Sequence, residues 1–164
     1  MTGTSKALGK FGKTAVDTVD VRTRSRIAAR AADDKKGEDV LVLDVAEIMG
    51  IVECFVITSA SNTRLVRSMV EEIEKRLFEE TGEKPRAVEG LRDASWVLLD
   101  YGDVVVHVFL RETREYYGLE RLWADAATVP WADSATTASY LRFTSARSSG
   151  SVTSSQVDRQ IMSA

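Results

Sequence analysis

The chain has 164 residues, a formal net charge of −3, and 44% hydrophobic and 29% charged residues. This length favours one domain with extensions, and the composition is that of ordinary soluble globular proteins, which excludes a fibrous or wholly disordered chain. No run of about 18 apolar residues is present, and residues 1–30 lack the apolar stretch of a signal peptide, so we expect a cytoplasmic protein without a membrane span.

Residues 1–22 mix Gly, Thr, Ser and Lys without clear periodicity, and we expect a loosely ordered extension there. The Ala- and Arg-rich segment after it favours a helix that stops before Gly37. Continuous apolar runs predict strands over residues 40–45 and 53–60, joined by a turn or short helical link over residues 46–50.

From Asn62 to Glu80 apolar residues recur at helical spacing, and charged residues take the other side, which predicts a helix lying on a sheet. The preceding SASN (59–62) invites comparison with a phosphate-binding turn, but it lacks the glycines of a phosphate loop. We therefore expect Ser61 or Asn62 to cap the helix. The last predicted elements are a short strand over residues 86–88, a β-hairpin over 96–109 and a helix over 111–123.

After Trp131 the composition changes, because 13 of the residues from Ser134 to Ala164 are Ser or Thr. We therefore expect one folded unit over residues 23–131 and a disordered tail over residues 132–164.

Charge is distributed unevenly along the chain. Residues 1–22 and 134–164 each carry +2, so the total of −3 leaves −7 for residues 23–133. Such an acidic unit repels phosphate backbones, so direct nucleic-acid contact is not expected to dominate, whereas a basic protein would be attracted to it.

The hairpin WVLLDYGDVVVHVF (96–109) has two apolar faces. With a turn centred on Tyr101 and Gly102, Trp96 opposes His107 and the two aspartates oppose each other. Because side chains alternate along a strand, one face is wholly aliphatic and is expected to be core. The other face holds Trp96, Leu98, Val105, His107 and Phe109, with Asp100 and Asp103 at the tip. An aromatic face rimmed by carboxylates indicates contact with a partner.

Other interpretations of these residues stay open. A helix of the same chain could cover the second face, with His107 hydrogen-bonded beneath it, and the two interpretations coexist if only the Trp96 end is covered. Asp100 and Asp103 could form a metal or acid–base pair, although aspartates around Tyr-Gly are common in turns. Cys54, the single cysteine, lies in an apolar run and is expected to be a buried small hydrophobe, so disulfides and a cysteine-based metal cluster are excluded. We expect no metal or cofactor.

Three stretches together resemble the ribosomal silencing factor family, also called Iojap-like proteins. They are AADDKKGEDVLVLDV, ECFVITSASN and the segment from PRAVEG to the end of RETREYYGLERLW. The resemblance spans about residues 24–131, and its most specific signals are the hairpin and the R-x-Y-Y-x-LE-x-LW pattern from Arg114 to Trp123.

The resemblance implies an α/β domain with a mixed five-stranded sheet and helices packed on it, similar in outline to nucleotidyltransferases but without their catalysis. It implies a factor that binds the basic fourteenth protein of the large ribosomal subunit on the intersubunit face, blocks joining of the small subunit and represses translation. The oligomeric state stays open, a homodimer included. We expect the contact surface among Trp96, Asp100, Tyr101, Asp103, His107, Tyr116, Tyr117, Leu122 and Trp123.

This sequence departs from the family pattern at Glu53-Cys54 and at Ser59-Ala60-Ser61-Asn62. These changes leave the hairpin intact but weaken phosphate binding further. The alternative function is a nucleotidyl-transferring enzyme, which would need metal-binding carboxylates beside a Gly-Ser turn. Here Ala60-Ser61 stands at the turn, so we expect no enzyme.

Overall fold

The computed structural model describes residues 19–132, and the chain divides into two compact units after Val129. Only residues 130–132 of the second unit are described, and the predictions for residues 1–18 and 133–164 lie outside the described residues. The elements of the first unit are α1 (Val21–Asp34), β1 (Glu38–Asp44), α2 (Ala46–Met49), β2 (Cys54–Ala60), α3 (Thr63–Thr81), β3 (Ala87–Glu89), β4 (Trp96–Asp100), β5 (Val104–Leu110), α4 (Arg111–Tyr117), α5 (Leu119–Leu122) and β6 (Ala127–Thr128).

The sheet is mixed, with the strand order β3-β4-β5-β2-β1-β6. β2 and β5 run parallel, and the other neighbouring strands are antiparallel. The α/β class and the mixed sheet are confirmed, but the described sheet has six strands and not five. The additional strand, β6, is only two residues long and pairs with Leu43 and Asp44, so it carries no alternation that a sequence could reveal.

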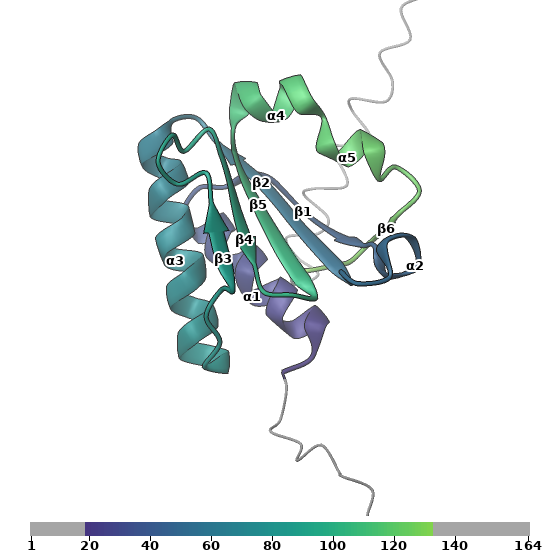
Figure 1. Ribbon diagram of the computed structural model, residues 1–164. Helices are drawn as coiled ribbons and strands as arrows, with labels where there is room; N and C mark the ends of the chain where they lie inside the picture. Colours follow the sequence, from purple (N-terminus) through teal and green to yellow (C-terminus); the bar gives the residue numbers. More distant parts are fainter. Residues whose placement is uncertain (1–18, 133–164) are drawn as a thin grey trace, which may run out of the picture. The chain divides into compact units, whose positions relative to one another are not determined.

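Two long helices, α1 and α3, cover one face of the sheet, and α4 and α5 lie on the other side (Figure 1). The α1 sequence suits close packing because its four alanines, from Ala28 to Ala32, are fully buried. On the sheet, the aliphatic hairpin face also belongs to the core, since Val97, Leu99, Val106 and Val108 are fully buried and Val104 is 1% exposed. The prediction for this face is confirmed.

Most predicted elements are present within a few residues of their expected ends. α1 begins at Val21, just inside the expected N-terminal extension, and the short link is the helix α2. The Asn62 side chain accepts a hydrogen bond of 2.9 Å from the Leu65 N–H, which confirms it as the cap of α3. The single helix expected over residues 111–123 is wrong, because Gly118 adopts φ of 53° and separates α4 from α5.

The hairpin register differs by two residues from the expected one. Trp96 pairs with Phe109, and His107 pairs with Leu98. The reason is that the turn is centred one residue later than expected, on Gly102 and Asp103, and is closed by a 2.9 Å hydrogen bond from the Tyr101 N–H to the Val104 carbonyl. Because the shift is an even number of residues, each side chain stays on its expected face.

Candidate functional site

The second face of the hairpin holds a packed aromatic row. The indole N–H of Trp96 donates a hydrogen bond of 3.2 Å to Nδ1 of His107. One face of the indole stacks on Phe109, with ring centroids 4.9 Å apart. Burial lowers the pKa of His107 to about 4, so the imidazole is neutral near neutral pH and can accept this bond. The Trp96 ring is therefore fixed with its N–H group directed at the core.

The chain itself covers most of this face. Leu119, Trp123 and Ala126 pack against a buried cluster that includes Phe55 and Phe109. His107 is only 5% exposed, and Trp96 is half-buried. A helix of the same chain thus covers the face with His107 hydrogen-bonded beneath it. The covering residues lie over His107, whereas Trp96 stays partly exposed. The two interpretations therefore coexist, but the covered end is that of His107 and not, as expected from the sequence, that of Trp96.

Two arginines fix α4 against the end of the sheet. Arg111 forms a paired hydrogen bond with the Glu38 carboxylate. Arg114, only 8% exposed, donates to the carbonyls of Glu38 and Asp39 at 3.1 and 2.9 Å, and to Glu120 at 3.0 Å. The Arg114 bonds occupy the inner side of α4, and the exposed Arg111–Glu38 pair ties its first turn to β1, so the remaining side chains of α4 are presented outward on a fixed support.

The outward side of α4 and α5 carries large apolar side chains. Tyr116, Tyr117 and Leu122 are 82%, 55% and 75% exposed. Tyr117 lies beside Trp96 at 5.1 Å between ring centroids, and Tyr116 meets Tyr117 edge-on at 5.0 Å. We call Trp96, Tyr116, Tyr117 and Leu122 the aromatic surface.

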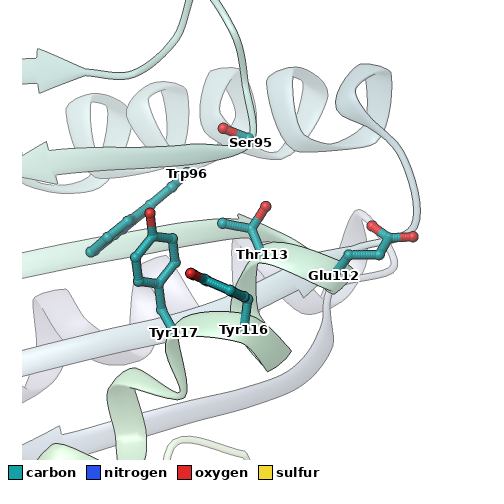
Figure 2. Close-up of a pocket in the computed structure, with 6 residues that line it drawn as sticks. All are labelled: Ser95, Trp96, Glu112, Thr113, Tyr116 and Tyr117. Carbon is teal, nitrogen blue, oxygen red and sulfur yellow. The ribbon is translucent and has the colours of Figure 1, made fainter.

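A groove opens within this region, with a volume of about 350 Å³. Figure 2 shows its lining, with Trp96 and Tyr117 side by side and Glu112 and Thr113 farther along α4. The lining residues are Ser95, Trp96, Glu112, Thr113, Tyr116 and Tyr117. Sequence reasoning missed Ser95, Glu112 and Thr113. Helical spacing was the available signal for Glu112, because it precedes Tyr116 by four residues and so shares its side of the helix.

The hairpin tip is a separate place, because Asp100 lies at the opposite end of β4 from Trp96. Asp100 accepts a hydrogen bond of 2.7 Å from the Gly102 N–H. Asp103 accepts one of 2.5 Å from the buried guanidinium of Arg24. Tyr101 is 4% exposed, and burial raises the pKa of its hydroxyl. The structure therefore does not join the tip residues to the aromatic surface.

The described residues do not support a metal site, a membrane-spanning helix or a cysteine nucleophile. Between residues 19 and 132 no three His, Cys, Asp or Glu side chains gather into a metal site, and no helix there is long and apolar enough to cross a membrane. Cys54 is buried, which raises the pKa of its thiol and makes it a poor nucleophile.

Comparison with known proteins gives a consistent result. A family model described as ribosomal silencing factor during starvation matches residues 18–160, beyond the end of the motifs quoted above. The chain is 45% identical over 101 residues to ribosomal silencing factor RsfS of Bacillus subtilis, covering 62% of this chain and 85% of the relative. It is 33% identical over 91 residues to the mouse protein named mitochondrial assembly of ribosomal large subunit protein 1, covering 54% of this chain and 40% of the relative. A crystal structure of a Chromobacterium violaceum protein is similar at a TM-score of 0.61 and 32% identity, covering 64% of this chain and 87% of that one.

Proposed function

Because the chain belongs to the family of ribosomal silencing factors, we propose that it binds the large ribosomal subunit of cytoplasmic ribosomes and blocks joining of the small subunit. Translation is repressed as a result. The partner is the basic fourteenth protein of the large subunit, on the intersubunit face. The chain acts by occupying this face and catalyses no reaction.

The exposure of the aromatic surface is the observation that carries this proposal. Tyr116, Tyr117 and Leu122 are each more than half exposed, although they sit on a frame held by buried arginine hydrogen bonds. Large apolar side chains gathered on a rigid support are typical of protein interfaces, where tyrosine and tryptophan bury much area at a low cost in side-chain entropy.

Charge supports a basic partner. Residues 23–133 carry −7, and the resulting field attracts a positively charged protein and accelerates the encounter. We therefore expect binding to weaken as salt is raised, because salt screens charges that are separated by more than a Debye length.

The nine predicted contact residues take different roles in this proposal. Trp96, Tyr116, Tyr117 and Leu122 make the contact. His107 and Tyr101, which are 5% and 4% exposed, support the hairpin from within. Trp123 is half-buried and packs on the core, so it holds α5 in place. Asp100 and Asp103 remain a weaker charged contact at the tip.

The test is co-sedimentation of the chain with isolated large subunits, followed by addition of small subunits. Leu122→Ala should weaken binding by about 1 to 2 kcal/mol, or roughly tenfold. Ile51→Ala is the matched control, because Ile51 is an equally exposed aliphatic residue, at 84%, in the loop after α2. Bound parent chain should also prevent formation of whole ribosomes.

Two results would count against the proposal. Failure of the parent chain to sediment with large subunits would remove the function altogether. If Leu122→Ala and Ile51→Ala changed the affinity for large subunits equally, the chain would still be a ribosome-binding factor, but its contact would not lie on the aromatic surface. Circular dichroism of each variant checks that a loss of binding does not come from unfolding.

A further inference from the structure

The groove of the aromatic surface has a distinctive lining. Three aromatic side chains, one glutamate, one serine and one threonine form it, and no purely hydrocarbon side chain takes part. Its volume of about 350 Å³ is at the low end of ligand sites. It therefore suits a single long side chain better than a helix or a large cofactor.

The carboxylate in the groove forms no direct bond with another side chain among the described residues, although it lies within the electrostatic range of Arg111. Glu112 makes no ion pair or hydrogen bond with any other residue in the part of the chain that the structure describes. The two arginines nearest to it on α4 are already engaged, Arg111 with Glu38 and Arg114 with Glu120. The oxygens of Glu112 are thus left for a ligand, because Arg111 gives its direct hydrogen bonds to Glu38.

The aromatic walls add to this preference. The Trp96 N–H is used by His107, so the indole contributes its ring and not a hydrogen-bond donor. Tyr116 and Tyr117 stand beside it, and Figure 2 shows the three rings gathered on one side of the groove with Glu112 beyond them. Aromatic faces attract cations, and a nearby carboxylate strengthens that attraction, whereas an anion would be repelled.

We propose that this groove binds a cationic side chain, arginine or lysine, of the protein partner, with its stem along the tyrosine rings and its charge at Glu112. The inference rests on the proposed function and gives the partner's contact a defined chemistry. A guanidinium fits such a site well because it stacks on rings and pairs with a carboxylate, and an ammonium uses the same two attractions.

The test compares two substitutions on the same helix. Glu112→Gln removes the charge in the groove, and Glu115→Gln removes another exposed carboxylate on α4 that does not line the groove. Dissociation constants for large subunits are measured at low and high salt. We expect Glu112→Gln to weaken binding about tenfold at low salt and to reduce the salt dependence. Glu115→Gln should stay within about twofold of the parent.

Further variants examine the rings and the charge separately. Tyr116→Leu should also weaken binding about tenfold, because it removes a π-face but keeps an apolar side chain. Glu112→Asp should restore part of the binding that Glu112→Gln loses. Competition with arginine amide and with lysine amide, at equal ionic strength, identifies the better cation by its stronger displacement of the parent chain.

The outcomes separate the two proposals. If the parent chain does not sediment with large subunits, the proposed function fails and this inference fails with it. If the parent sediments and the two glutamine variants bind equally well, the function stands and the cation-binding groove is refuted. Equal unfolding free energies of the variants, measured in urea, exclude a general loss of structure.

Discussion

The buried imidazole of His107 makes the stability of the fold sensitive to acid. Its pKa is lowered by burial from 6.5 to about 4. Between these two pH values His107 is protonated in the unfolded chain but neutral in the folded chain. The free energy of unfolding is therefore highest above about pH 6.5 and decreases as the pH falls toward 4. A difference of about 2.5 pKa units corresponds to about 3 kcal/mol at about pH 4.

The geometry explains why protonation is resisted. Nδ1 already accepts the Trp96 N–H, so a proton there would face another donor, and Nε2 is buried without a partner among the described residues. The assay is urea unfolding from about pH 7 to about pH 4 for the parent and for His107→Gln, which cannot titrate. The parent should lose about 3 kcal/mol more than the variant over this range. Parallel pH profiles for the two proteins would refute the reasoning.

Three further predictions concern stability and are checked by urea unfolding. Arg24→Met should lower the free energy of unfolding by about 3 kcal/mol, because the carboxylates of Asp103 and Glu83, at 2.5 and 2.8 Å from its guanidinium, lose their buried cation. The control Arg22→Met removes an exposed ion pair and should lower it by less than about 1 kcal/mol. Gly90→Ala should cost more than about 3 kcal/mol, since its Cβ would lie 2.0 Å from a backbone oxygen, whereas Gly50→Ala, at a similar φ with open space, should cost about 1 kcal/mol. Asn62→Ala should cost about 1 kcal/mol through loss of the α3 cap, and a neutral result would show that the 2.9 Å hydrogen bond contributes nothing.

Alternating hydrophobicity was sufficient to predict the hairpin faces, because successive side chains of a strand point to opposite faces whatever the pairing register. The register was not predictable in the same way. The sequence around Tyr101-Gly102-Asp103 is compatible with a turn centred on Tyr101-Gly102 or on Gly102-Asp103, and only the hydrogen bond from Tyr101 to Val104 selects the second. The helix break at Gly118 has a clearer sequence signal, since glycine readily adopts the left-handed backbone that ends α4.

The candidate site was only partly predictable for a related reason. Tyr116, Tyr117 and Leu122 were predicted as contact residues from a specific motif, and all three are exposed, while their contact with a partner stays a prediction. Asp103 was expected at a free tip, but its partner Arg24 lies 79 residues earlier in the chain. Ion pairs over such distances leave no local pattern, so sequence periodicity cannot assign these charges.

The strands at the borders of the sheet limit how another protein can associate with it. β3 has three residues and β6 has two, so each of these border strands offers very few backbone groups of its own to an incoming strand. Strand addition at β3 or β6, the mode by which many domains capture extended peptides, is therefore disfavoured. At these two strands recognition relies on side chains, and a hydrophobic surface can be exposed nearby with little backbone template for aggregation through β3 or β6.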